Sequence, residues 1–209
     1  IRKILIDDIQ NWSISVRNSK GNQILDINGL QPMTPASNLK LLTTAYALDK
    51  LGPYHRLRTK FTINNNNTIF VRGEGDPDLL EYSFINLLNY SLNLIDPSKT
   101  VYINLYDSSP QNWWPYNWTY YDRNYTYGAP VTKIAISSNS YPLSLSNPVE
   151  YLKQIILQHS EANNYRTEIS YKTDDNLIKT NNILNSNAIK YSAPLYALIS
   201  LANSESHNF

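Results

Sequence analysis

The feature that most constrains the fold is an amphipathic segment with a clear start and a clear end, residues 34–52. Thr34 is a suitable N-cap, Pro35 suits the first helical position, and Gly52 followed by a proline is a common helix end. Between them, apolar side chains recur at helical spacing, in two neighbouring rows: Leu39, Leu42 and Tyr46, and Leu41, Ala45 and Leu48. The sequence therefore predicts a helix over this segment.

Strands and further helices are predicted on both sides of this helix. Residues 12–29 alternate in polarity around the turn letters NSKGN, which predicts a β-hairpin. Residues 57–75, with the turn NNNN, predict a second hairpin. Other segments follow the same patterns, with strands expected at 100–109, 133–139 and 166–175, and helices at 81–94, 148–164 and 193–206.

Composition excludes several classes of protein. The chain has 209 residues, enough for one large or two small domains, and 42% are hydrophobic, enough for a core. A net charge of +1 with interspersed signs argues against nucleic acid as a partner. No apolar run reaches the roughly 18 residues of a membrane helix, so no transmembrane segment is expected.

The chemistry of the side chains narrows the choice further. There is no cysteine, which excludes disulfides, thiol nucleophiles and cysteine-based zinc sites. The three histidines lie far apart without metal-ligand spacing, so neither a metal nor another cofactor is expected. The chain begins with Ile and carries no signal-like segment, and we expect the natural polypeptide to begin upstream of it.

Ser37 and Lys40 are the candidate catalytic pair. They stand three residues apart at the start of the predicted helix, where i and i+3 side chains are neighbours. A serine hydroxyl is a weak nucleophile unless a base takes its proton, and a lysine can do so only when its amine is uncharged. This Ser-x-x-Lys is the only one in the chain. The spacing alone equally fits an exposed serine beside a solvated lysine, so the surrounding sequence has to decide.

The surrounding sequence resembles the class C penicillin-binding proteins, the D-alanyl-D-alanine carboxypeptidase/endopeptidase family. The letters PASNLK, TTA and ALDKLG match its active-site segment in order. VRGEGDPDLL resembles its Gly-Asp-Pro element, and residues 112–140 resemble its Trp-rich stretch leading to Tyr-Gly-Ala. Three ordered matches are far more specific than one Ser-x-x-Lys.

Two further motifs of the family bear on the site. Three pairs fit its Ser-x-Asn motif: Ser91/Asn93, Ser137/Asn139 and Ser206/Asn208. The last follows a predicted helix and precedes an aromatic residue, as in the family, so we assign Ser206 to proton relay and Asn208 to substrate binding. The third motif, Lys-Thr-Gly or His-Thr-Gly, is absent from the 209 residues.

The resemblance implies a fold and a domain plan. We expect the α+β fold of the serine β-lactamase/penicillin-binding superfamily, in which an antiparallel sheet is flanked by helices and carries an inserted strand-rich domain. The incomplete catalytic domain is placed at residues 1–58 and 186–209, and the insert at 59–185. Because the opening hairpin provides two of the family's five strands, we expect the others, with the third motif, after residue 209.

The same resemblance implies a function. The protein is expected to be a serine-type D-Ala-D-Ala carboxypeptidase or endopeptidase that acts on peptidoglycan stem peptides through an acyl-enzyme, binds β-lactams, and is exported to the periplasm or cell envelope. The 209-residue chain alone is expected to be inactive. Two alternatives stay open: a non-catalytic fragment or degenerate homologue that only binds cell-wall peptide or glycan, and an esterase or β-lactamase on the same scaffold.

Two remaining segments have both a functional and a structural interpretation. Glu74, Asp76 and Asp78 could bind Ca²⁺, but their spacing does not match an EF-hand loop, and a structural turn is the preferred interpretation. The aromatic side chains of the segment NWWPYNWTYY could stack on sugars or peptides. Aromatic side chains more commonly pack in the core or at a domain interface.

Overall fold

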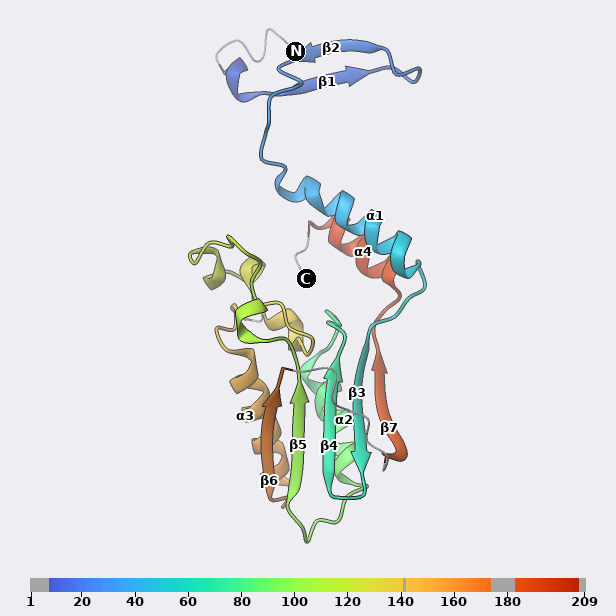
Figure 1. Ribbon diagram of the computed structural model, residues 1–209, viewed down its shortest axis with the longest axis vertical. Helices are drawn as coiled ribbons and strands as arrows, with labels where there is room; N and C mark the ends of the chain where they lie inside the picture. Colours follow the sequence, from blue (N-terminus) through green and yellow to red (C-terminus); the bar gives the residue numbers. More distant parts are fainter. Residues whose placement is uncertain (1–7, 141, 174–182, 207–209) are drawn as a thin grey trace. The chain divides into compact units, whose positions relative to one another are not determined.

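The structure is a computed structural model that describes residues 8–140, 142–173 and 183–206, and the backbone alone for 183–187. Contacts within the chain divide it into two compact units, residues 1–43 and 44–209, and each is described by itself. Figure 1 labels the α-helices and strands of both units. The domain boundaries expected from the sequence, at 58/59 and 185/186, stay a prediction.

The first unit contains the predicted hairpin. Strands β1 (Ile14–Arg17) and β2 (Gln23–Ile27) pair antiparallel, with Ile14 opposite Ile27, after the short 3₁₀ turn η1 (Ile9–Asn11). The Asn18 side chain accepts hydrogen bonds from the backbone N–H groups of Lys20 and Asn22, which closes the turn. Ile27 is the one buried hydrophobic side chain among the described residues of this unit.

The predicted helix begins later than expected. A 3₁₀ turn, η2 (Ala36–Asn38), comes first, and the α-helix α1 spans Leu39–Leu51. The reason is Ala36, whose φ of 45° lies in the left-handed region and cannot continue a right-handed helix from Pro35. The predicted end is confirmed, because Gly52 has φ +82° and its N–H bonds the Leu48 carbonyl at 3.0 Å.

The second unit is built on a five-stranded mixed sheet in the order β6-β5-β4-β3-β7. Strand β3 is antiparallel to β4 and β7, whereas β4, β5 and β6 run parallel. The strands span the following residues: β3 Arg58–Asn64, β4 Thr68–Gly73, β5 Val101–Tyr106, β6 Thr167–Lys172 and β7 Ile183–Tyr191.

Helices cover one face of this sheet. Helices α2 (Glu81–Leu92) and α3 (Pro148–Ala162) lie on the same side of it, and α4 (Leu195–Ser204) follows β7 (Figure 1). Side chains alternate along β3, so that Phe61 and Ile63 are fully buried beneath the helices. They form one hydrophobic core with side chains of β4, β5, α2 and α3.

Most elements expected from the sequence are confirmed. The second hairpin is β3–β4, the segment 100–109 contains β5, and 166–175 contains β6. The helices at 81–94, 148–164 and 193–206 are α2, α3 and α4, the last beginning after its N-cap Pro194. The predicted α+β class is therefore confirmed.

One predicted strand is wrong and one strand was missed. Residues 133–139 form no strand but end in a 3₁₀ turn, η6 (Ile136–Asn139). Their backbone is bound by other partners, since the Ile134 N–H donates to the Asp107 carboxylate at 2.9 Å and the Ser137 N–H to the Leu79 carbonyl at 2.8 Å. Strand β7 was not predicted, because its sequence contains Asn and Lys and lacks the alternating pattern of a strand. It forms through its hydrogen-bonded pairing with β3.

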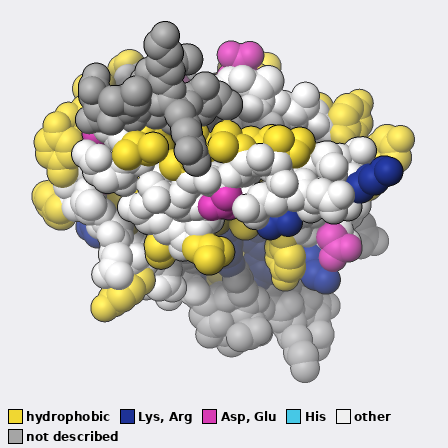
Figure 2. Space-filling model, turned by 90° about the horizontal axis from the view of Figure 1, so that it is seen from above, with side chains coloured by type: hydrophobic (Ala, Val, Ile, Leu, Met, Phe, Trp, Pro, Cys, Tyr) yellow, Lys and Arg dark blue, Asp and Glu magenta, His cyan; other side chains and the backbone are white. Residues whose placement is uncertain are grey.

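Hydrophobic side chains also reach the surface. On the face that Figure 2 shows, they lie among backbone and other uncharged side chains, with few charged groups. Helix α1 contributes to the exposed apolar side chains, since it has no buried residue and Leu39, Leu42 and Tyr46 are more than half exposed.

Within the described ranges, no helix has both the length and the apolar character needed to span a membrane.

Candidate active site

Ser37 and Lys40 lie side by side at the junction of η2 and α1. The Lys40 ammonium Nζ donates a hydrogen bond to Ser37 Oγ at 3.4 Å. Ser37 is the second residue of the 3₁₀ turn and Lys40 the second residue of the α-helix. The spacing of three residues therefore brings the hydroxyl and the amine together, as the sequence predicted.

The backbone at this junction is constrained around the serine. Ala36 holds the left-handed conformation, which costs an L-residue with a side chain about 1–2 kcal/mol. The Asn38 N–H closes the turn on the Pro35 carbonyl at 2.9 Å. Non-glycine residues in such conformations gather at functional sites, where the surrounding structure maintains them. The strain at Ala36 is thus an observation, independent of the motif, that favours a functional Ser37.

The environments of the two side chains suit different roles. Ser37 is exposed, so a substrate carbonyl can approach its oxygen, whereas Lys40 is half-buried in the first turn of α1. A contact of 3.4 Å is long for a hydrogen bond, as catalytic contacts often are in structures without substrate. The pair can therefore support proton transfer from the hydroxyl to an uncharged amine.

Ser206, the predicted proton relay, belongs to the second compact unit. It is exposed, lies two residues beyond the end of α4, and has a left-handed φ of 52°. Asn208, the predicted substrate-binding residue, lies outside the described residues. The grouping of Ser206 and Asn208 with Ser37 and Lys40 stays a prediction.

The other two Ser-x-Asn pairs have structural tasks. Ser91 is buried in α2 and its hydroxyl donates to the Leu87 carbonyl at 2.8 Å. The Asn139 side chain is buried and donates to the Pro130 carbonyl at 2.9 Å and to Thr132 Oγ1 at 2.8 Å. Ser91 and Asn139 therefore have structural roles in the second unit.

The Gly-Asp-Pro segment is a structural turn, as preferred from the sequence. Asp76 is fully buried, accepts the Asp78 N–H at 2.9 Å, and forms an ion pair with Lys190 of β7 at 2.6 Å. Glu74 is engaged by Arg58 of β3 instead. Two of the three carboxylates considered for Ca²⁺ therefore already have cationic partners.

Sequence reasoning had no signal for the Asp76–Lys190 pair, since its members stand 114 residues apart and meet only because β7 joins the sheet. The pair matters for the fold, because removing one partner of a buried ion pair leaves the other charge uncompensated. Among the described residues, no group of histidine and acidic side chains is arranged to hold a metal ion.

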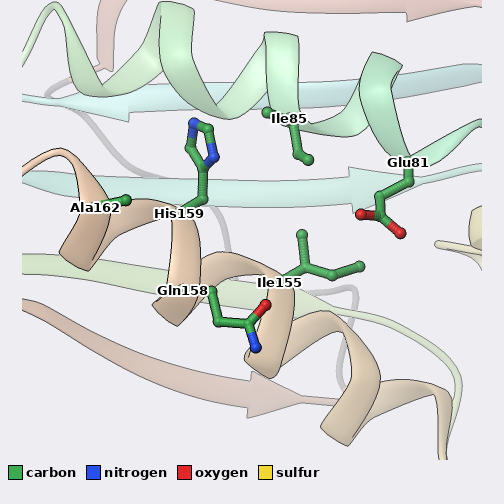
Figure 3. Close-up of a pocket in the computed structure, with 6 residues that line it drawn as sticks. All are labelled: Glu81, Ile85, Ile155, Gln158, His159 and Ala162. Atoms are coloured by element: carbon green, nitrogen blue, oxygen red, sulfur yellow. The ribbon is translucent and has the colours of Figure 1, made fainter.

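A shallow groove lies between α2 and α3 (Figure 3). Its lining mixes apolar and polar side chains: Glu81, Ile85, Ile155, Gln158, His159 and Ala162. Two polar groups are already engaged, since Glu81 accepts the Tyr151 hydroxyl at 2.6 Å and the His159 ring contacts the Asn89 side chain. Burial, helped by Glu81, raises the pKa of Tyr151 to about 12. Among the described residues of the second unit, Ser206 does not line this groove.

Comparison with known proteins adds the family. The model of the family described as D-Ala-D-Ala carboxypeptidase 3 (S13) matches residues 3–190, most of the chain. The chain belongs to this family. Membership in the S13 family confirms the resemblance read from PASNLK and the two later segments. No curated protein matches the chain in sequence.

Solved structures agree on the fold. Penicillin binding protein 4 (dacB) from Haemophilus influenzae matches with a TM-score of 0.75 at 16% identity, over 94% of this S13 chain and 61% of that one. The same protein complexed with a β-lactam matches with a TM-score of 0.63 at 16% identity, over 95% and 60%. A predatory endopeptidase from Bdellovibrio bacteriovorus has a TM-score of 0.48 at 18% identity, over 93% and 52%.

The two structures of penicillin binding protein 4 confirm the penicillin-binding-like fold. The chain spans about three fifths of the length of the first two solved structures.

Proposed function

We propose that the full-length protein is a serine-type D-Ala-D-Ala carboxypeptidase or endopeptidase of peptidoglycan stem peptides, and that it binds penicillins. The observation that carries the proposal is the 3.4 Å contact between Lys40 Nζ and Ser37 Oγ, in a chain of the S13 family. Export to the periplasm or cell envelope belongs to the same proposal, because its substrate lies there.

The proposed reaction is acyl transfer. Lys40, in its uncharged form, takes the proton of Ser37 Oγ while that oxygen attacks the carbonyl carbon between two D-alanines. The C–N bond breaks, and the departing D-alanine amine receives a proton passed through Ser206. Asn208 holds the peptide backbone of the substrate. Water then hydrolyses the ester on Ser37, which releases the shortened peptide and regenerates the hydroxyl.

Fluorescent penicillin tests the nucleophile. The full-length protein is expected to be labelled covalently, and Ser37→Ala is expected to abolish the label, because no other oxygen replaces Oγ. Lys40→Gln should slow labelling by about 10²–10⁴-fold, the usual contribution of a general base. The measurement is the labelling rate followed by gel fluorescence.

The control is Ser83→Ala, which removes a hydroxyl from α2 in the other compact unit and should label at the unmodified rate. Circular dichroism spectra check that each variant is folded. Persistent labelling of Ser37→Ala would refute the assignment of the nucleophile.

A second candidate is a non-catalytic module that only binds cell-wall peptide or glycan. The observation that favours it is the lack of Lys-Thr-Gly or His-Thr-Gly in the 209 residues. In the family that strand supplies an oxyanion donor, and loss of one such donor lowers kcat by about 10²–10³-fold. If the full-length protein carries no such motif and no penicillin label, the module is the better description.

A further inference from the structure

The loop between β5 and α3 exposes an unusual number of aromatic rings. Its first two, Trp113 and Trp114, are buried and half-buried, and their indole N–H groups donate to the carbonyls of Ser108 at 3.2 Å and Gly128 at 2.8 Å. This part of the loop packs, as the sequence favoured. The rings that follow are exposed: Tyr116, Trp118, Tyr120, Tyr121, Tyr125 and Tyr127.

Three of the exposed rings form an ordered surface, the tyrosine platform, made of Tyr121, Tyr125 and Tyr127. The rings of Tyr125 and Tyr127 are stacked, with centroids 5.3 Å apart and planes 7° apart. The ring of Tyr121 lies 5.2 Å from that of Tyr125, and their hydroxyls are 2.5 Å apart. The stacking turns one face of Tyr125 and one face of Tyr127 toward each other, but 69%, 41% and 45% of the three residues stay exposed, so surface remains for a ligand.

Asp122 holds the platform in shape. Its carboxylate accepts hydrogen bonds from the Tyr127 hydroxyl at 2.9 Å and the Thr119 hydroxyl at 2.5 Å. The backbone closes tightly beneath it through the 3₁₀ turns η4 (Asp122–Asn124) and η5 (Thr126–Gly128), so that a Cβ on Gly128 would lie 1.9 Å from the Asp122 carbonyl oxygen. Short turns and side-chain contacts thus position the rings before any ligand arrives.

The two charged side chains beside the platform, Asp122 and Arg123, are engaged by other side chains of the loop. Asp122 is occupied by two hydroxyls, and the Arg123 guanidinium lies over the rings of Trp114 at 4.5 Å and Tyr120 at 5.4 Å. The hydrogen bond to Asp122 raises the pKa of Tyr127, and the one with Tyr121 raises the pKa of Tyr125. The platform therefore presents ring faces edged with protonated hydroxyls, which suits a neutral polyhydroxylated ligand better than an ionic one.

From this arrangement we infer that the tyrosine platform binds the glycan strand of the cell wall, a chain of N-acetylated amino sugars. The apolar faces of the sugar rings stack on Tyr125 and Tyr127, and their hydroxyl and amide groups bond the phenol oxygens. The choice of a cell-wall glycan rests on the proposed function. The platform itself does not depend on the chemistry at Ser37.

The test is direct binding of a β-1,4-linked N-acetylglucosamine tetrasaccharide to the 209-residue chain, measured by isothermal titration calorimetry. Tyr125→Ala is expected to weaken binding by about two- to tenfold, the range of a lost aromatic contact. Tyr125→Phe keeps the ring and should retain most of the affinity. Tyr82→Ala removes an exposed ring from α2 and should leave binding unchanged. Circular dichroism checks the fold of each variant.

The outcomes separate the two proposals. Ser37→Ala should bind the tetrasaccharide normally, so a failure of penicillin labelling leaves the glycan result intact. No measurable binding, or equal weakening by Tyr125→Ala and Tyr82→Ala, would overturn the platform assignment. A glycan-free stem peptide that binds with the same dependence on Tyr125, while the tetrasaccharide does not, would also overturn it and would indicate a peptide site.

Discussion

At the scale of single residues, the pair Arg58–Glu74 ties the start of β3 to the segment after β4. The guanidinium donates from Nη2 at 2.5 Å and from Nε at 3.0 Å to Glu74 Oε1, and the Arg58 backbone N–H bonds Oε2 at 2.9 Å. The hydrogen bond from Arg58 is the main cause that holds the pKa of Glu74 below its ordinary value. The contact therefore stabilises the ionised carboxylate in the folded state.

This contact predicts a pH dependence of stability. A carboxyl with a lowered folded-state pKa stabilises the fold above its unfolded-state pKa, about 4.3, and that contribution is lost as the pH falls through the folded-state pKa. Glu74→Gln should cost about 1 kcal/mol or less at pH 7, because the pair is largely exposed, and should make unfolding less sensitive to acid. Urea unfolding at pH 7 and pH 3.5 measures both effects.

A larger loss of stability from Glu74→Gln at pH 3.5 than at pH 7 would contradict this assignment.

Contacts between single residues differ in how far the sequence predicts them. Ser37 and Lys40 stand three residues apart on a predicted helix, so their meeting follows from local geometry. Lys190 and Asp76 meet only through the pairing of β7 with β3, which the sequence pattern did not show.

At the scale of elements, α2 contributes buried side chains to the hydrophobic core of the second unit. Phe84 of α2 is fully buried and its ring meets that of Phe61 of β3 edge to face, with centroids 5.2 Å apart. Aromatic pairs in this geometry add to the stabilisation from burial alone. The helix was predictable because its apolar positions recur with helical period, whereas the partner it packs on was not.

Phe84→Ala should therefore be strongly destabilising, by about 3–5 kcal/mol, the range for removing a buried phenylalanine. Tyr82→Ala is the matched control, because it lies on the exposed side of the same helix and should change stability by about 0.5 kcal/mol or less. Urea unfolding followed by circular dichroism compares the two. Similar losses for both variants would show that α2 does not pack as described.

At the scale of the whole molecule, the two compact units differ in what holds them together. The second has a continuous hydrophobic core, whereas among the described residues of the first only Ile27 is a buried hydrophobic side chain. An isolated two-stranded hairpin is at best marginally stable in water. We therefore expect the two units to differ in local stability.

Hydrogen exchange should show the difference. Amides of β1 and β2 are expected to exchange within minutes, while those of β4 and β5, which are flanked by strands on both sides, exchange slowest. Mass spectrometry of peptides from a time course measures this. Equal protection of the β1–β2 hairpin and of β4 would refute the expectation.

The sequence by itself determined the local features of this protein: both hairpins, the helices, the α+β class, the Ser37–Lys40 contact and the family. The hairpins, the helices and the Ser37–Lys40 contact depend on residues within a few positions of one another, where period, caps and turns act directly. The class and the family follow from three motifs that occur in order along the chain. Tertiary structure alone decided the mixed five-stranded sheet, the non-strand conformation of residues 133–139 and the Asp76–Lys190 pair. These depend on which distant segments supply hydrogen-bond partners and burial, and no local pattern encodes that choice.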